Sequence, residues 1–193
     1  MVSHNHSLKW TLRAAALGIA VITVLLVVLQ SPKTETAQPD GNPFSNLSMS
    51  LTSSAFASGG KIPGDYTCDE RNVSPPLHFG TMPANAQTIA LIMDDPDAPA
   101  GAWTHWIFWN LPVAAGDLKA GDPMAKAVLG RTSFGQPGYG GPCPPSGEHH
   151  YYFRAYALDA ALTLPPGSDA AALRQAMTGH VVGQAELIGT YSR

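Results

Sequence analysis

The sequence predicts a mostly β domain of the α+β class, preceded by a separate apolar segment. Short runs of β-branched and aromatic residues, apolar or alternating with polar ones, recur between Leu47 and Tyr191. Such runs are typical of strands. The 19 Gly and 17 Pro residues of the chain separate them as turns would. Only residues 168–184 show the composition of a helix, so strands should dominate.

The N-terminal residues 1–30 carry a membrane-targeting signal. Lys9 and Arg13 precede a segment that is uncharged from Ala14 to Leu29. Its length falls between the apolar region of a signal peptide, about 7–15 residues, and a spanning helix, about 17–25. No good small-x-small cleavage site follows closely, so we favour an uncleaved anchor over a cleaved signal peptide.

This anchor also predicts where the protein lies. The positive flank should remain in the cytoplasm, so the domain should face outward from the cell membrane, into the periplasm or the extracellular space. Cleavage would instead give a secreted protein. Residues 31–45 are rich in Pro and Thr and read as a flexible linker, which leaves residues 46–193 as one domain.

Within this domain the strands and loops can be placed from local patterns. Residues 131–147 hold five Gly and four Pro, which predicts a long irregular loop, and loops of this length are usually functional. Residues 168–184 should form the one helix, capped by Ser168 or Asp169. We expect strands over residues 46–54, 88–93, 104–111, 151–158 and 187–191.

Composition excludes several classes of protein. With 45% hydrophobic residues the chain is not a disordered tail. The net charge is −3 and the basic residues are few and scattered, so no nucleic-acid partner is expected. Two cysteines make neither a disulfide-dense miniprotein nor a four-cysteine zinc site. No HExxH or CxxC spacing occurs, and we predict no metal and no cofactor.

Two segments concentrate reactive side chains. In the first, three carboxylates, on Asp94, Asp95 and Asp97, follow a predicted core strand, and His105 stands near the start of the next one. A carboxylate close to a histidine would raise its pKa and fix its tautomer. The alternative is that these aspartates only cap turns, which is the common role of a single Asp before Pro.

The second segment contains adjacent histidines. In an extended chain His149 and His150 point to opposite faces, so they should not bind one metal together. His149 and Tyr151 share a face beside the Gly/Pro loop, whose free backbone N–H groups would suit a small anion. For either histidine alone, a core side chain satisfied by a carbonyl is the alternative.

Five segments of the domain together resemble the phosphatidylethanolamine-binding protein family, and within it the bacterial Raf-kinase-inhibitor-like branch. They are residues 66–77 (YTCDERNVSPPL), 94–99 (DDPDAP), 103–112 (WTHWIFWNLP), 138–159 (GYGGPCPPSGEHHYYFRAYALD) and 185–193 (AELIGTYSR). The resemblance implies an antiparallel central sheet, a second smaller sheet and a C-terminal helix. It also implies a pocket for phosphate-like anions and phospholipid headgroups.

The family's pocket motifs can be carried over residue by residue. The residues that match them are Asp95, Asp97, Pro99, His105, Gly141, Pro142, His149 and Tyr151. An anion beside carboxylates needs an explanation, and our hypothesis is that the aspartates orient His105 and His149 and favour their protonated forms. Affinity should then be modest and should weaken as the pH rises.

Cys68 and Cys143 lie in the two loops that flank the expected pocket. In an exported domain they could form a disulfide, and closing a loop of about 75 residues could stabilise the fold by about 4 kcal/mol. The alternative is two free thiols with a packing role, because relatives without export signals share both positions.

Three functional classes are compatible with this sequence. The leading one is a binding module of the cell envelope for a small anion or phospholipid headgroup, which could inhibit a protease or kinase as family members can. The second is an enzyme that uses the Asp, His and Tyr side chains for acid–base chemistry on a phosphate ester, although no nucleophile accompanies them. The third is an envelope interaction protein with a vestigial pocket.

Overall fold

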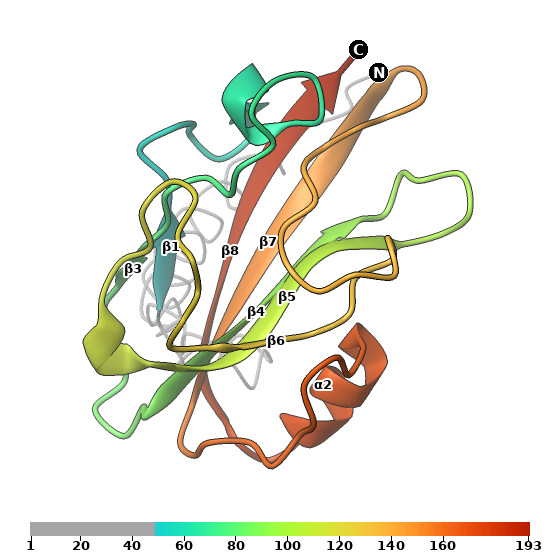
Figure 1. Ribbon diagram of the computed structural model, residues 1–193. Coiled ribbons are helices and arrows are strands. Elements are labelled where there is room, and N and C mark those ends of the chain that lie inside the picture. The colour runs from blue at the N-terminus through green and yellow to red at the C-terminus, as the bar shows by residue number, and fades with distance from the viewer. Residues whose placement is uncertain (1–48) are drawn as a thin grey trace, which may run out of the picture. The chain divides into compact units, whose positions relative to one another are not determined.

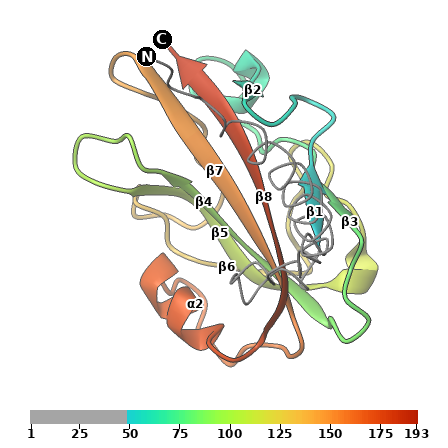
Figure 2. The ribbon, with the colours of Figure 1, turned by 180° about the vertical axis from the view of Figure 1, so that it is seen from behind.

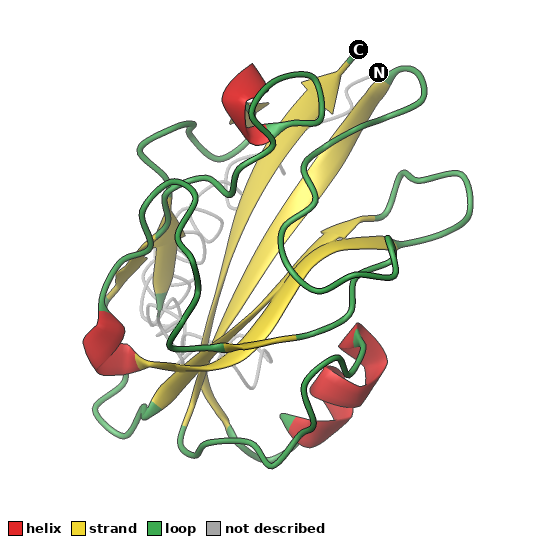
Figure 3. Cartoon of the chain, in the orientation of Figure 1, coloured by secondary structure: helices red, strands yellow, loops and turns green. Residues whose placement is uncertain are grey.

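The computed structural model describes residues 49–193, so the expected anchor and linker lie outside the described residues. Within residues 49–193 no helix is long and apolar enough to cross a membrane. The described chain forms two sheets, one α-helix and two single-turn 3-10 helices, η1 (Gly64–Tyr66) and η2 (Val113–Ala115) (Figure 3). For this part of the chain, the predicted mostly β fold with one helix is confirmed.

The larger sheet has six strands in the order β2-β8-β7-β4-β5-β6. All neighbours are antiparallel except β2 and β8, which are parallel. The smaller sheet pairs β1 (Ser50–Thr52) with β3 (His78–Gly80). The strands of the larger sheet are β2 (Gly60–Lys61), β4 (Thr88–Asp95), β5 (Trp103–Pro112), β6 (Val128–Leu129), β7 (Glu148–Leu158) and β8 (Val181–Ser192).

Every residue of β4 is buried, which the apolar run over residues 88–93 predicts for all but the two aspartates at its end. Because successive side chains of a strand point to opposite faces, β4 supplies two cores. Leu91 and Met93 pack in the core that includes β1 and β3, whereas Ala90 and Ile92 pack in the core beneath helix α2 (Ala170–Ala176). Figures 1 and 2 show α2 beside β5 and the small sheet on the other side.

The sequence overestimates the length of the helix, which was expected over residues 168–184. Helix α2 ends at Ala176, and β8 already begins at Val181. Gly179 has a φ of 83°, a conformation that favours glycine and is common after a helix end. The β-branched pair at 181–182 then favours a strand.

The strand boundaries also differ from those predicted. The expected strands over residues 88–93, 104–111 and 151–158 are present and slightly longer, as β4, β5 and β7. The short final strand over residues 187–191 is part of the twelve-residue β8. Of the expected strand over residues 46–54, the part described is 49–54, and within it residues 50–52 form β1. The loop over residues 131–147 is irregular apart from one isolated bridge.

Candidate ligand-binding site

Sheet register brings the predicted site residues to one end of three adjacent strands. Asp95 at the end of β4 pairs with Trp103 at the start of β5, and Asp94 pairs with Tyr152 near the start of β7. The first residues of β5 and β7 therefore lie beside the last residues of β4. Chain segments that are up to about fifty residues apart in sequence meet at this edge.

A bulge in β5 controls where His105 points. Met93 of β4 pairs with Trp106, but Asp94 pairs with Thr104, so His105 is an extra residue between two aligned positions. A bulge of this kind commonly redirects a side chain next to a functional site. His105 packs edge-on against the Tyr151 ring, with ring centroids 5.2 Å apart.

Asp95 fixes His149. The Asp95 Oδ2 atom lies 2.8 Å from Nδ1 of His149, and both side chains are buried. The other oxygen, Oδ1, accepts a hydrogen bond of 2.9 Å from the backbone N–H of Asp97. Because both carboxylate oxygens are engaged, the Asp95 side chain has one orientation, and His149 is left with Nε2 as its free ring nitrogen.

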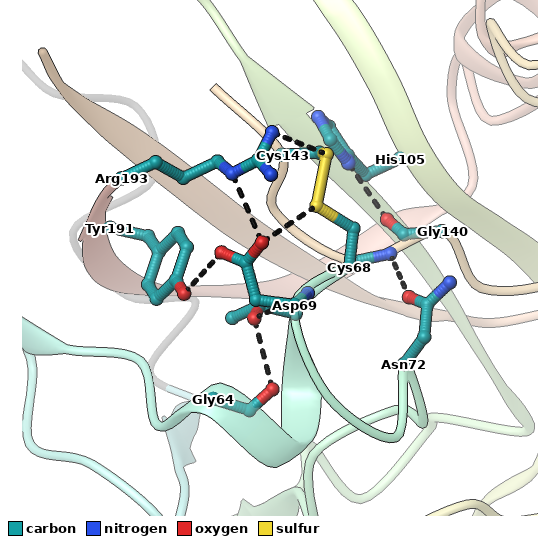
Figure 4. Close-up of a disulfide and its surroundings, with 11 residues drawn as sticks. Gly64, Cys68, Asp69, Asn72, His105, Gly140, Cys143, Tyr191 and Arg193 are labelled. Carbon is teal, nitrogen blue, oxygen red and sulfur yellow. Dashed lines mark hydrogen bonds and ion pairs between the residues drawn. A yellow bond between two sulfur atoms is a disulfide. The ribbon is translucent and has the colours of Figure 1, made fainter. Parts of the chain in front are cut away.

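His105 is fixed by a carbonyl rather than by an aspartate. Its Nδ1 donates to the Gly140 carbonyl at 2.7 Å, as Figure 4 shows. The expectation that an aspartate orients His105 and favours its protonated form is therefore wrong. Burial lowers the pKa of His105, and the Gly140 carbonyl and the Asp95 charge offset this only in part. Neutral His105 thus has a bare Nε2.

Both histidines line a small pocket of about 190 Å³, which we call the histidine pocket. Four of the eight predicted residues line it. The remaining wall is apolar, made mostly of proline and aromatic side chains. Its lining residues are Asp95, Ala98, Pro99, Trp103, His105, Phe134, Cys143, Pro144, Pro145 and His149.

Asp97, predicted at the same site, binds the other histidine instead. Its Oδ2 accepts from the backbone N–H of His150 and lies within hydrogen-bonding distance of Nδ1 of the same residue, both at 2.8 Å. These hydrogen bonds from His150 lower the pKa of Asp97. His150 points away from His149, as the alternation of β7 predicts, so Asp97 does not line the pocket and contacts it through its backbone hydrogen bond with Asp95.

Tyr151 lies below the pocket rather than in its wall. Its side chain is fully buried against His105, and its hydroxyl has no hydrogen-bond partner among residues 49–193. Burial, with the Asp95 charge as a smaller contribution, raises the pKa of Tyr151 far above its usual range. It is therefore an uncharged support for His105.

The backbone N–H groups of the glycine loop are not all free. Gly140 donates to the His105 carbonyl at 2.9 Å, and Gly141 donates to Oδ1 of Asn72 at 2.8 Å. The carbonyl of Pro142 accepts from the backbone N–H of Cys68. Gly141 and Pro142 therefore hold the loop in place, and the expectation that N–H groups at these glycines meet an anion is wrong.

In the structure, Cys68 and Cys143 form a disulfide with their Cα atoms 5.4 Å apart. Figure 4 shows this bond, which joins the loop after η1 to Cys143, one of the residues that line the histidine pocket. Asp69, next to Cys68, also holds the chain's end: it accepts from the Tyr191 hydroxyl at 2.7 Å and pairs with Arg193 at 3.0 Å.

Asp94 serves the other face of the sheet. Its Oδ2 atom pairs with Arg174 of α2 at 2.6 Å and with Arg154 of β7 at 3.3 Å. Only Asp95 of the three predicted carboxylates therefore lines the pocket. Across residues 49–193, no three His, Cys, Asp or Glu side chains gather as metal ligands would.

Sequence reasoning missed the aromatic part of the wall. Phe134 packs edge-on against Trp103 and His105, with ring centroids 5.4 and 5.3 Å apart. The only signal was a single large apolar residue inside the Gly- and Pro-rich loop. A largely apolar pocket with a few convergent polar groups is the kind of feature at which proteins bind small ligands.

The chain belongs to the phosphatidylethanolamine-binding protein family, whose members it matches over residues 52–192. This confirms the family predicted from the sequence motifs. Membership supports a binding function in general, and the identity of the ligand must be argued from the pocket.

Relatives and solved structures agree with this assignment. The UPF0098 protein of Methanothermobacter thermautotrophicus is 48% identical over 150 residues, 75% of this chain and 99% of the relative. The crystal structure of a phosphatidylethanolamine-binding protein homologue, CT736 of Chlamydia trachomatis, has a TM-score of 0.73 at 43% identity, covering 76% of this chain and 99% of that one. Escherichia coli YbcL has a TM-score of 0.70 at 27% identity, covering 75% and 98%. Such relatives consist almost wholly of the region that matches this domain, so we expect residues 46–193 to fold as an independent unit.

Proposed function

We propose that the domain binds a small phosphate-bearing anion in the histidine pocket, whether as free phosphate, a phosphate ester or a phospholipid headgroup. One observation carries this proposal: two buried histidines with fixed Nδ1 atoms line the same pocket. Because each Nδ1 is engaged, each ring can offer only Nε2 to a ligand. A ring nitrogen that carries a proton donates a hydrogen bond, and one without a proton accepts a hydrogen bond. A phosphate can pair with either, because it has acceptor oxygens and can carry an O–H donor.

A neutral His105 suits free phosphate or a phosphate monoester that still carries a proton, whereas a phospholipid headgroup is a diester without such a proton and would have to be bound through a donor. A neutral His105 has a bare Nε2 that can accept a hydrogen bond from a phosphate O–H, while a protonated His149 would donate to a phosphate oxygen. Asp95 is already engaged by His149 and the Asp97 backbone, which limits its repulsion of the ligand. No arginine lines this pocket in the described chain, so a bidentate clamp is lacking and affinity should be modest.

We also propose that residues 1–30 anchor this domain to the cell membrane with the pocket on the outer side. The proposal rests on the basic flank and the uncharged run from Ala14 to Leu29. A blot of membrane and soluble fractions for the full chain tests it. A full-length protein in the membrane fraction is expected, and a shortened protein in the soluble fraction would contradict it.

The binding proposal is tested by titrating the domain, residues 46–193, with inorganic phosphate, phosphoethanolamine and phosphoglycerol. We expect saturable NMR shifts of the His105 and His149 ring signals and at least tenfold weaker binding by His149→Ala. His150→Ala is the matched control, because His150 is also paired with an aspartate but points away from the pocket. Equal losses in the two variants, or no shifts at high ligand concentration, would refute the proposal.

A further inference from the structure

A second cavity of about 260 Å³ lies directly beside the histidine pocket, and we call it the neutral cavity. Its lining residues are Cys68, Asn72, Thr132, Phe134, Gln136, Pro137, Gly138, Tyr139, Gly140, Gly141 and Cys143. Phe134 and Cys143 line both cavities. The two are therefore neighbouring compartments that share one wall.

The two compartments differ in charge. The histidine pocket contains Asp95 and two histidines, whereas none of the described residues that line the neutral cavity is charged at neutral pH. Most of the polar side chains of the neutral cavity already have partners. Asn72 Oδ1 accepts from the Gly141 N–H, and the Tyr139 hydroxyl donates to a backbone carbonyl at 2.6 Å. What remains for a ligand is a mainly apolar surface.

Phe134 forms the shared wall and faces solvent. Among residues 49–193, Phe134 is the one large hydrophobic side chain that is exposed, with 46% of its surface accessible. Exposing an aromatic ring to water is unfavourable. Edge-on packing against Trp103 and His105 keeps the Phe134 ring in this exposed position. Gly140 permits this position, because a Cβ atom at that residue would collide with the Phe134 ring.

We infer that the two cavities form one composite site for a phosphate ester with a neutral, apolar organic group. This inference rests on the proposed function. The phosphate lies beside His105 and His149, and the organic group packs across the Phe134 ring into the neutral cavity. The charge distribution disfavours esters that carry a second charge at the far end, because that charge would be desolvated without a partner.

The test compares methyl phosphate with phenyl phosphate on the domain. The phosphate groups are alike, so any difference in affinity reports the organic group. We expect phenyl phosphate to bind about tenfold more tightly, since burying one aromatic ring against another is favourable. Phenyl phosphate should also shift the backbone amide signals of Thr132 and Gln136, which methyl phosphate should leave in place.

Two variants test the neutral cavity through ratios of affinities. The first ratio is the affinity for phenyl phosphate divided by the affinity for methyl phosphate. Phe134→Ala should bring the ratio close to one, because the shared aromatic wall is gone. Gln136→Lys adds a positive charge to the neutral cavity alone. It should raise the affinity for 4-carboxyphenyl phosphate relative to phenyl phosphate by about fivefold, as expected for a partly exposed ion pair of about 1 kcal/mol.

A further arm separates soluble esters from lipids. Dihexanoyl phosphatidylglycerol, below its micelle concentration, carries an apolar group next to a phosphodiester. Shifts of Thr132 and Gln136 by this lipid would support the composite site with a lipid source. The same shifts by phenyl phosphate alone would support it with a soluble source.

Failures of the two proposals are distinguishable. If both esters bind equally and only the histidine signals move, the composite site is refuted and the binding function stands. If phenyl phosphate moves Thr132 and Gln136 without moving the histidines, the cavities are independent and the inference is also refuted. If no phosphate compound binds, both proposals fail.

Discussion

At the residue scale, the pocket depends on two histidines that are fixed by different acceptors. Asp95 holds Nδ1 of His149, and the Gly140 carbonyl holds Nδ1 of His105. A carboxylate is charged and a carbonyl is not, so the two rings sit in different electrostatic surroundings although they line one pocket. Because burial lowers the pKa of His105, the titration of this residue should be visible in the stability of the domain.

The lowered pKa of His105 predicts that the ligand-free domain loses stability in mild acid. Burial lowers the pKa of His105 below the ordinary value of 6.5, so the unfolded chain binds the proton more readily than the folded chain. Stability is therefore fully present above about pH 6.5 and falls as the pH drops toward the folded-state pKa. Urea unfolding from pH 7.5 to 4.5 should show this loss in the wild type and a smaller one in His105→Gln. Parallel pH profiles for the two proteins would contradict it.

The sequence predicted one of these histidines better than the other. The alternation of β7 correctly puts His149 and Tyr151 on one face. The partner of His149 is Asp95, one of the carboxylates that the sequence places directly after a core strand. The partner of His105 could not be predicted, because it is a backbone carbonyl 35 residues away. The bulge that redirects His105 depends on register with β4, which no local pattern reveals.

At the scale of elements, helix α2 is held by its cap and by charges on the sheet. Asp169 Oδ1 accepts from the N–H of Ala172 at 3.0 Å, so Asp169 is the N-cap. Ser168, the other residue considered, donates its hydroxyl to the Pro165 carbonyl. The local sequence limits the candidates for the N-cap residue to Ser168 and Asp169. The backbone geometry of the folded chain determines which of the two accepts the hydrogen bond from the helix N–H.

Removing this cap should destabilise the domain measurably. Asp169→Ala leaves a helix N–H without its acceptor and should lower the free energy of unfolding by about 1 kcal/mol. Asp169→Asn keeps an acceptor and should recover most of that loss, and Ser168→Ala should cost less than Asp169→Ala. Chemical denaturation of the three variants is the measurement. A larger cost for Ser168→Ala than for Asp169→Ala would mean that the cap is wrongly assigned.

At the scale of the whole domain, one disulfide crosslink connects two loops that are far apart in the sequence. The Cys68–Cys143 disulfide spans 75 residues of sequence and reaches the shared wall of both cavities. The family motifs could predict the sheets and the pocket from sequence, but spacing alone could not decide between a bridge and two free thiols. That choice depends on the distance between two loops, which only the folded chain fixes.

Removing the crosslink should lower stability without abolishing the fold. The Cys68→Ser, Cys143→Ser double variant should lose up to about 4 kcal/mol of unfolding free energy, according to the chain-entropy estimate for a loop of this length. Urea unfolding measures the loss. Intact mass after thiol alkylation without reductant checks the bond itself, and two alkylated cysteines in the wild type would contradict the crosslink.

The central claim is that ring nitrogens of the pocket histidines bind the anion, and a pH series with sulfate tests it most directly. Sulfate keeps its charge between about pH 5.5 and 8.5, so a change in its affinity reports protonation of the protein in the range where histidine titrates. Sulfate has no proton to donate to a bare Nε2, so its binding requires a protonated ring. We predict saturable shifts of the His105 and His149 signals and an affinity that falls by up to tenfold per pH unit as the pH rises. An affinity that stays constant over this range, or binding that leaves both histidine signals unmoved, would contradict the claim.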